Sequence, residues 1–534
     1  MVSWSHGTSC LEAFSLHRRQ TGSEPATMLE VVPSSPQVLL LVVVLLFVAA
    51  KLLFTGKDKR PPLPPGPRPL PLLGNALDFP KSHLGREFRS LSEKYGDVSY
   101  LSVLGQSIIL VNSYDAACEL LEKRSGNYSD RPQSAMVKMT NLDWIFVFKD
   151  YGAEWRRYRR ELHVSFVPEM MTRYFAIQRQ YTRGLLRNLL DTPADFSAHI
   201  KFSFAAVVLR IVYGLDPEQG ERKYYKLVER LATIAEDIST PGRHIVEAFP
   251  SMQRLPSWFP GTGFMQLAAT WKAEIASIRD YLYDSAKETM GTSGVKESII
   301  TRLTEERVED ELSRNVTATI YAAGSDTTNA AVHAFVLAMA MFPEAQRKAQ
   351  AELDAVVGPD RLPDFADQKS LPYVSALMKE VLRWHVVAPI GVPHRSTEAD
   401  EYGGYYLPGG SLIIVNQWAM SRDPAYFPDP ENFYPERFLL NGQLNPAIRD
   451  PAKFVFGFGR RICPGLHFAE AALFLNCAYI LHTLNITPPL DLHGNPKKLE
   501  MKTNSLAVSH LLPFECRILA RNAHMKELVR GNSA

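Results

Sequence analysis

Apolar residues recur at helical spacing along most of the chain after residue 75. This periodicity predicts amphipathic helices over 84–95, 115–123, 154–163, 172–190, 199–213, 222–236, 265–290, 307–341, 344–356, 372–385 and 466–483. Strand-like runs are short and lie at 98–104, 107–113 and 411–416. Since no internal repeat divides this region, the pattern predicts one mainly α domain with a small β region over residues 76–534.

The N-terminus departs from this pattern. Residues 37–54 are apolar except for Gln37 and Lys51, which predicts a transmembrane anchor, because about 20 apolar residues span a bilayer and a terminal Lys can reach the headgroups. Three basic residues come directly after it: Lys57, Lys59 and Arg60. Their charge favours a cytosolic C-terminal domain, although two arginines upstream weaken the asymmetry. A cleaved signal peptide is the alternative.

Two further segments flank the predicted anchor. Residues 1–36 form a polar leader, which we expect to be lumenal or unstructured, and translation could start at Met28 instead of Met1. Residues 55–75 are first basic and then rich in proline, with the sequence PPLPPGPRPLPLLGN. Such proline density favours stiff, extended backbone and predicts a semi-rigid linker. A proline-rich ligand for a partner domain is the alternative.

Composition is that of a globular protein, with 46% hydrophobic and 22% charged residues. The formal net charge is +2, so no basic excess points to nucleic acid as a partner. The five cysteines are few, odd in number and scattered, which argues against a disulfide framework and for a reducing compartment. Each cysteine must therefore be interpreted from its neighbours.

The cysteine with the most informative neighbours is Cys463, in the segment FGFGRRICPG at 456–465. The glycines of this segment allow close approach of the backbone to another group. Pro464 precedes a predicted helix, and at a helix N-terminus the macrodipole and free amides favour a thiolate. A thiolate of this kind suits a haem iron. A buried structural cysteine is the alternative, and His467 completes no zinc site with it.

Phe456, Gly459, Arg461, Cys463 and Gly465 form the pattern F-x-x-G-x-R-x-C-x-G. It resembles the cysteine loop of the cytochrome P-450 superfamily at every defining position, and the other signatures of that family follow in order over almost the whole chain after the linker. The resemblance implies the mainly helical P-450 fold and haem b with Cys463 as the axial thiolate ligand. It also implies that dioxygen is reductively activated and that one oxygen atom enters the substrate.

The segment 317–336 is an apolar predicted helix with a polar centre. Its small residues leave room above a flat cofactor: Ala322, Ala323 and Gly324. The segment is similar to the helix that crosses the oxygen-binding face in the P-450 family. The resemblance implies that Thr327 orients the iron-bound oxygen and that Asp326 passes protons inward. The alternative is a buried helix whose Ser and Thr side chains bond only to backbone.

Glu380 and Arg383 stand one helical turn apart, which by itself is typical of an ordinary surface ion pair. Together with Arg437 in the segment PERF, they are similar to a paired element of the P-450 family. The resemblance implies a buried charge triad that holds the cysteine loop. Loss of one member would then leave a buried charge unpaired.

The propionates of a haem need cationic or hydrogen-bonding partners. Trp155 and Arg159 in EWRRYRR resemble the family helix that supplies two of them, and Arg461 of the cysteine loop is a further expected partner. His394 falls where the family often places another, with an exposed position as the alternative. Three neighbouring arginines are expected to face solvent or an acidic electron donor: Arg156, Arg157 and Arg160.

Apolar residues from several segments are expected to line a substrate pocket, although each could equally belong to the core. They are Met136, Phe146, Ala322, Ile390, Val392 and Ala507. Their character suits a lipophilic small molecule. The segments RSGNYSDRP and WFPGTGF resemble those of fungal, particularly mushroom-type, members that modify natural products, which implies a terpenoid or aromatic secondary metabolite as the substrate.

The resemblance also implies partners. No fused flavin or iron–sulfur segment is recognisable in the chain, so NADPH-derived electrons are expected through a separate NADPH–cytochrome P-450 reductase, with cytochrome b5 as a further candidate. With the anchor, the expected location is the endoplasmic reticulum membrane, in contact with lipid, with a cytosolic catalytic domain. A haem-thiolate isomerase or dehydratase without dioxygen is one alternative, against which Asp326 and Thr327 argue. A non-catalytic haem-binding protein is another.

Overall fold

The computed structural model describes residues 60–531 except 217–221, 241, 293–296 and 505–506, together with Val42, Val44 and Leu45. The chain divides into two compact units, Met1–Arg60 and Pro61–Ala534. The predicted leader lies outside the described residues. So does the predicted anchor, except for the three isolated residues, which are helical and exposed.

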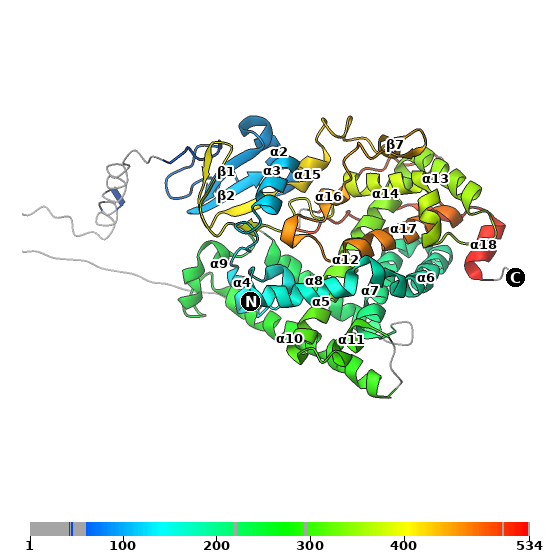
Figure 1. Cartoon of the computed structure of the whole chain (residues 1–534), viewed down its shortest axis with the longest axis horizontal. Helices are drawn as coiled ribbons and strands as arrows, with labels where there is room; N and C mark the ends of the chain where they lie inside the picture. The colour runs from blue at the N-terminus through cyan, green and yellow to red at the C-terminus, as the bar shows by residue number, and fades with distance from the viewer. Residues whose placement is uncertain are drawn as a thin grey trace, which may run out of the picture. The chain divides into compact units, whose positions relative to one another are not determined.

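Helices dominate the second unit, as the periodicity predicts (Figure 1). They are α2 (Leu84–Tyr95), α3 (Tyr114–Cys118), α4 (Ala135–Met139), α5 (Ala153–Phe166), α6 (Pro168–Asp191), α7 (Phe196–Tyr213), α8 (Arg222–Ser239), α9 (Ile245–Ala248), α10 (Gly263–Thr292), α11 (Ile299–Glu305), α12 (Asp310–Met341), α13 (Pro343–Val356), α14 (Pro372–Trp384), α15 (Gln417–Ser421), α16 (Ala452–Val455), α17 (Leu466–Thr483) and α18 (Ala523–Arg530). Prolines at the first positions of α6, α13 and α14 mark helix starts, because a proline there loses no hydrogen bond.

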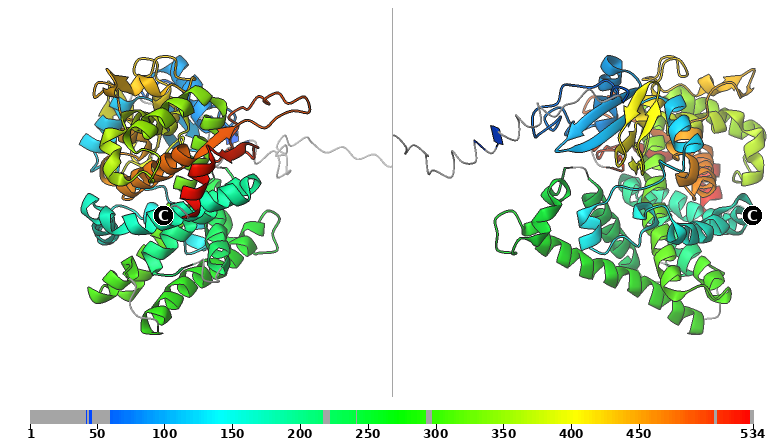
Figure 2. Two further views of the ribbon diagram at one scale, coloured as in Figure 1. Left: turned by 90° about the vertical axis from the view of Figure 1, so that its right-hand side faces the viewer. Right: turned by 60° about the vertical axis from the view of Figure 1, so that its left-hand side comes forward.

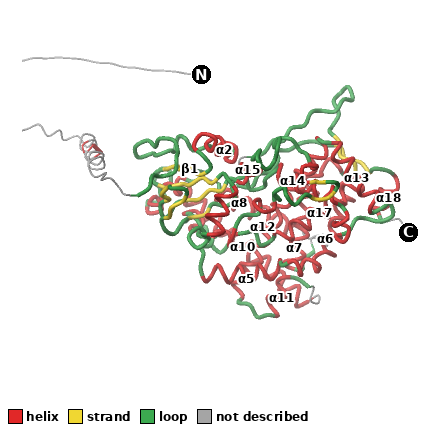
Figure 3. The backbone as a smooth tube through the Cα atoms, turned by 45° about the horizontal axis from the view of Figure 1, so that its top comes forward, coloured by secondary structure: helices red, strands yellow, loops and turns green. Residues whose placement is uncertain are grey.

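The strands are few and gather mostly on one side of the unit (Figure 3). They are β1 (Val98–Val103), β2 (Gln106–Val111), β3 (His394–Arg395), β4 (Asp400–Tyr402), β5 (Tyr405–Leu407), β6 (Leu412–Val415), β7 (Leu439–Leu440), β8 (Gln443–Leu444), β9 (Leu484–Thr487) and β10 (Arg517–Ala520). A four-stranded sheet has the order β1-β2-β6-β3, and the other strands form two-stranded pairs. The hairpin β1–β2 is antiparallel, and β2 runs parallel to β6, which Figure 2 shows beside it.

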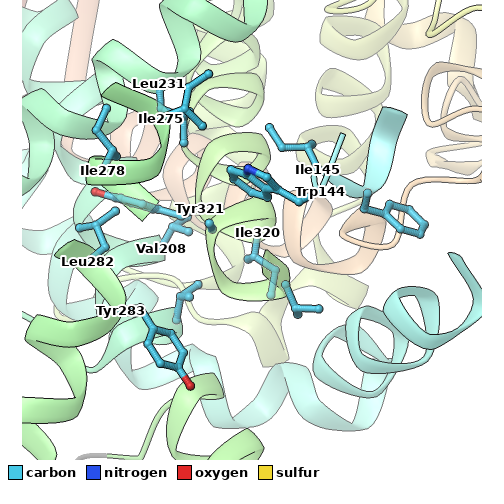
Figure 4. Packing of buried hydrophobic residues seen from close by; sticks show 14 of the residues in the cluster. Trp144, Ile145, Val208, Leu231, Ile275, Ile278, Leu282, Tyr283, Ile320 and Tyr321 are labelled. Carbon is cyan, nitrogen blue, oxygen red and sulfur yellow. The ribbon is translucent and has the colours of Figure 1, made fainter. Parts of the chain in front are cut away.

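The core lies around α12, a helix of 32 residues that passes through the middle of the helical part (Figure 1). It packs against α7, α17, α10 and α14. Figure 4 shows part of this packing, where Trp144 lies close to Ile320 of α12 and aliphatic residues of α10 lie nearby. Because most of α12 is buried, an exposed residue at its centre indicates a space beside the helix.

One helical stretch among the described residues is long and apolar enough to cross a membrane, Pro193–Tyr213. It is 67% buried and contains α7, which packs on α6 and α12. This is the behaviour of a core helix that is apolar on all sides. It is not the anchor predicted from the sequence.

The periodicity predicted the long helices to within a few residues, and the mainly α fold class is confirmed. The short helices α4, α9, α11, α15, α16 and α18 were missed, as were most of the two- to four-residue strands. Elements this short carry no measurable period, and their conformation is set by the partners on which they pack.

Candidate active site

The cysteine loop is held in a conformation that its glycines permit. Cys463 lies between a short turn, Gly459–Arg461, and the start of α17, and its amide donates to the carbonyl of Phe456 at 2.8 Å. Gly459 has a φ of +52°, and a Cβ at this position would stand 2.1 Å from the carbonyl oxygen of Leu121. Only glycine fits there, because the loop backbone packs directly on the turn Glu119–Lys123.

The protein surroundings of Cys463 shift the pKa of its thiol in the direction opposite to the one expected from the helix start. Burial raises the pKa of the thiol, and this effect outweighs the amide of Gly465 and the charge of Arg159, both of which lower it. The helix start therefore acts in the expected direction but does not by itself favour the thiolate. A coordinating metal cation deprotonates a thiol outright. Among the described residues no group of three or more His, Cys, Asp or Glu could hold a metal, so a metal at Cys463 has to bring its other ligands.

Near the loop, buried donors stand without acceptors. The indole Nε1 of Trp155 and the Nη1 of Arg461 are both buried and have no hydrogen-bond partner in the described part of the chain. The guanidinium of Arg461 lies 4.8 Å from the centre of the Trp155 ring, and its other nitrogens donate to the carbonyls of Ser129 and Lys149. Burial lowers the pKa of Arg461 to about 10. Unpaired buried donors are costly, which indicates that an anionic acceptor belongs here.

Two further groups join this cluster. His394 is buried and not exposed, and its Nδ1 lies 2.7 Å from the carbonyl of Tyr128. Arg131 is buried, and it donates to the carbonyls of Val147, Val392 and Pro393. Burial holds the pKa values of both groups well below their ordinary values, and each also lies close to the charge of Arg461. The two carboxylates of a haem fit this donor set.

Arg131 was missed by the sequence analysis, because nothing in SDRP distinguishes it from a surface arginine. Arg159 is half-buried on α5, and its Nη1 donates to the carbonyl of Ile462 at 2.7 Å, next to Cys463. It therefore contacts the cysteine loop itself. The three neighbouring arginines, Arg156, Arg157 and Arg160, are exposed.

The centre of α12 has two different faces. Thr327 donates its hydroxyl to the carbonyl of Ala323 at 3.0 Å, which is the back-bond expected for a helix that opens locally. Both residues are exposed although they lie in the middle of a buried helix. A Cβ at Gly324 would come no closer than 3.5 Å to Val208. One face of α12 is thus left free by the surrounding side chains, as a flat cofactor requires.

Asp326 faces a different side. Its Oδ2 lies 2.9 Å from the Nε2 of His510 in the C-terminal loop, a residue that the sequence analysis did not identify. Burial would raise the pKa of Asp326, but the hydrogen bond and charge of His510 lower it overall. Burial would lower the pKa of His510, whereas Asp326 raises it overall. Each group of the pair therefore favours the charged form of the other.

The structure brings the three members of the predicted triad together. Arg383 binds both carboxylate oxygens of Glu380, at 2.7 and 2.8 Å, and Arg437 lies 3.1 Å from the same carboxylate. The side chains of Glu380 and Arg383 are fully buried. Arg383 also donates to the carbonyls of Ser421, Pro430 and Asn432, so its guanidinium is fully engaged. A further buried arginine, Arg422, which sequence reasoning missed, donates to the carbonyls of Arg383 and Trp384.

The residues predicted to line a substrate pocket fall into separate places. Met136 and Phe146 are buried in the cluster that also contacts Ala322, and Phe146 stacks on Trp155 at 5.3 Å. Ile390 packs in a different hydrophobic cluster, with α2 and the sheet. Val392 is 42% exposed, and Ala507 is half-buried.

Known proteins resemble this chain over most of its length. Residues 64–511 match the family model of cytochrome P450. Cytochrome P450 monooxygenase COX1 of Coprinopsis cinerea is 40% identical over 88% of this chain and 93% of its own. Cytochrome P450 monooxygenase claR of Ampulloclitocybe clavipes is 36% identical over 88% of this chain and 89% of its own. Cytochrome P450 monooxygenase ple1 of Rhodocybe pseudopiperita is 36% identical over 89% and 92%. The chain therefore belongs to the cytochrome P450 family of haem-thiolate monooxygenases.

Proposed function

We propose that this monooxygenase binds haem b between its cysteine loop and α12, and that it inserts one oxygen atom from dioxygen into a lipophilic small molecule. Membership of the family implies a thiolate-ligated haem, dioxygen and electrons from a reductase. The observation that carries the residue assignment is the combination of one lone sulfur ligand, Cys463, with the buried donors Trp155 Nε1 and Arg461 Nη1 that lack acceptors. A porphyrin with two carboxylates supplies both the missing metal ligands and the missing acceptors.

On the sulfur side, the residues bind and position. Cys463 would hold the haem iron through its sulfur, and Arg159 fixes the loop through the carbonyl of Ile462. Trp155, Arg461 and His394, with Arg131, bind the propionates. Phe456 and Gly465 flank the sulfur in the loop, and the triad of Glu380, Arg383 and Arg437 holds the segments on which the loop rests.

On the α12 side, Ala323 and Gly324 would leave space for the haem, the hydroxyl of Thr327 would orient dioxygen, and Asp326 would supply protons. When bound, the haem provides the electron transfer and oxygen chemistry, and a thiolate ligand favours cleavage of the O–O bond. The back-bond of Thr327 to Ala323 supports this role, because it places a hydroxyl on the free face of the helix.

The partners follow from the family and from the surface. A separate NADPH–cytochrome P-450 reductase delivers electrons, with cytochrome b5 as a further donor. The exposed arginines Arg156, Arg157 and Arg160 offer a basic surface for an acidic donor. The apolar segment 37–54 anchors the chain in the endoplasmic reticulum membrane, with the catalytic unit in the cytosol.

The substrate is a lipophilic small molecule, and the reaction is a modification step in fungal secondary metabolism on a terpenoid or aromatic compound. Similarity to fungal monooxygenases supports this assignment. The apolar character of Met136, Phe146 and Ala322, next to the free face of α12, supports a lipophilic ligand.

The decisive experiment is the absorption spectrum of the reduced protein under carbon monoxide. We expect a strongly red-shifted Soret band that is lost in Cys463→Ser and kept in Cys516→Ser, a matched variant of another partly buried cysteine. A band typical of histidine-ligated haem in the wild type would contradict the assignment.

Reaction class is then tested with labelled dioxygen, reductase and NADPH. Incorporation of one labelled atom into a product supports a monooxygenase. Product formation under nitrogen without NADPH would instead identify an isomerase or dehydratase, and thiolate haem without NADPH-dependent oxygen consumption would identify a non-catalytic haem protein.

A further inference from the structure

A cavity of about 260 Å³, lined by both polar and apolar side chains, lies beside α12, away from the face that carries Thr327. It is lined by residues of α7, α8, α12 and the C-terminal loop, and it is partly open to solvent. Its charged and titratable lining residues are Lys201, Glu229, Glu236, Asp326, His333 and His510. Lys201 and Glu229 form an ion pair with side chains 35% and 43% exposed, so the outer end of the cavity reaches solvent.

At the inner end stands the contact between His510 and Asp326. The backbone of His510 is fixed, because its amide donates to the side chain of Asn504 and its carbonyl accepts from the amide of the same residue. The amide of Ser509 donates to the carbonyl of Val387, which ties the loop to the segment after α14. The imidazole is thus held over Asp326 by the fold and not only by the ion pair.

Between the two ends lies Glu236 of α8. It is half-buried, and its Oε1 is buried without a hydrogen-bond partner in the described part of the chain. Burial raises its pKa, opposed by the charge of His510. A buried carboxylate oxygen without a partner, beside a cavity that is open to solvent, favours a bound water molecule at this position.

The histidines around this cavity differ in charge. His333 bonds to Ser197 and to the carbonyl of Asn329, and burial lowers its pKa to about 4. Burial likewise lowers the pKa of His385, behind the cavity, to about 3. His510, facing Asp326 and Glu236 with Lys201 opposing, has a raised pKa. Of these three, His510 is the one whose surroundings favour the protonated form.

We propose that this cavity is the entry route of protons to Asp326, with His510 as the donor between solvent and the carboxylate. The inference rests on the proposed function and deepens it. A proton moves from Nε2 of His510 to Oδ2 of Asp326, which leaves a neutral imidazole and a neutral carboxylic acid. Asp326 passes this proton to the face of α12 that carries Thr327, and water in the cavity, assisted by Glu236, reprotonates the imidazole.

The kinetic test uses the full chain with reductase and NADPH, without added substrate, so that no unidentified compound is needed. His510→Gln keeps a hydrogen-bond donor but does not titrate. We expect NADPH oxidation to slow by about tenfold or more, with a larger solvent deuterium isotope effect and a flatter pH profile. Glu236→Gln should show a smaller loss of the same kind. His333→Gln, in the same cavity, should match the wild type.

A second test needs no turnover. Deuterium exchange at the imidazole C2 position, followed by mass spectrometry across pH, reports the titration of His510. We expect its midpoint to fall in Asp326→Asn and to stay unchanged in His333→Gln. An unchanged midpoint in Asp326→Asn would overturn the contact on which the route depends.

The outcomes distinguish failure of the proposed function from failure of the proton route. A wild type without thiolate spectrum or NADPH oxidation overturns the proposed function and this inference with it. A wild type with both, but with His510→Gln identical to it in rate, isotope effect and pH profile, overturns the proton route alone. A slowed His510→Gln with unchanged isotope effect and pH profile assigns the residue a structural role and also overturns the route.

Discussion

Two groups of buried arginines in this domain are bonded in different ways. Arg383 and Arg437 share the carboxylate of Glu380, and the remaining guanidinium nitrogens donate to backbone carbonyls. Arg131 and Arg461 are bonded to carbonyls too, but no carboxylate contact accompanies them, and Arg461 keeps one buried nitrogen without a partner among the described residues.

The difference separates a structural site from a binding site. In the triad, charge is neutralised by the protein, and the group is complete when the chain folds. In the second group, the protein supplies donors and cations and leaves the acceptor to a ligand. Burial alone does not distinguish the structural site from the binding site, because all four arginines lie in the interior. The hydrogen-bond partners of the arginines distinguish them.

The largest loss of stability is expected from a substitution in the triad of Glu380, Arg383 and Arg437. Arg383→Ala leaves Glu380 as a buried, unbalanced carboxylate, and we expect a loss of about 3–5 kcal/mol in the free energy of unfolding. Haem content after expression should fall to background. Arg361→Ala removes an exposed ion pair with Asp367 and should cost no more than about 1 kcal/mol. Normal holoprotein from Arg383→Ala would contradict the structural role of the triad.

A smaller loss in the free energy of unfolding is expected from a substitution in the cysteine loop. Gly459→Ala requires φ of +52° from an alanine and places its Cβ 2.1 Å from the carbonyl of Leu121, so the backbone must move. We expect at least about 2 kcal/mol of destabilisation, measured by chemical denaturation.

Gly442→Ala is the matched control for this change. It has a φ of +75° but open space around the added Cβ, so it carries the backbone strain alone, about 1 kcal/mol. Equal losses in the two variants would show that the close approach at Gly459 is not a constraint.

Substitution of Arg461, in the group of arginines without a carboxylate partner, should leave the free energy of unfolding unchanged or raise it. Arg461→Leu removes a buried cation that forms no direct ion pair with a carboxylate among the described residues, so we expect the haem-free chain to be as stable as the wild type, or more stable by up to about 1 kcal/mol. Haem affinity should fall by about 10- to 100-fold, because a charge-assisted hydrogen bond to a carboxylate is lost. Competition with a haem-binding apoprotein measures the affinity. A destabilised haem-free chain with normal affinity would place Arg461 with the structural arginines.

The comparison also explains what the sequence could predict. Long helices such as α12 were predictable because the period extends over many turns, and Cys463, Glu380 and Arg383 because they stand in short linear patterns. Arg131 and His510 have no such pattern. Their roles arise when segments far apart in the chain meet, as when the C-terminal loop reaches α12 at Asp326.

The residues predicted to line the pocket also show what a sequence cannot predict. Ile390 and Met136 are both apolar and follow or precede recognisable motifs, yet they pack in different clusters. An apolar side chain specifies burial but not the neighbours against which it is buried. The anchor segment 37–54, predicted from hydropathy alone, stays a prediction.

The smallest effect on stability is expected for the pair of His510 and Asp326, which is an ion pair only while both groups are charged. Because the folded pKa of His510 is raised, its contribution to stability is present below the unfolded value of about 6.5 and is lost as the pH rises through the folded value. Because the folded pKa of Asp326 is lowered, its contribution is present above about 4 and is lost at lower pH. The stability difference between wild type and Asp326→Asn should therefore be largest between about pH 4 and 6.5, on the order of 1 kcal/mol, and should decline at higher pH. Urea denaturation across this range measures it, and a difference that is constant with pH would show that the contact is a hydrogen bond between neutral groups.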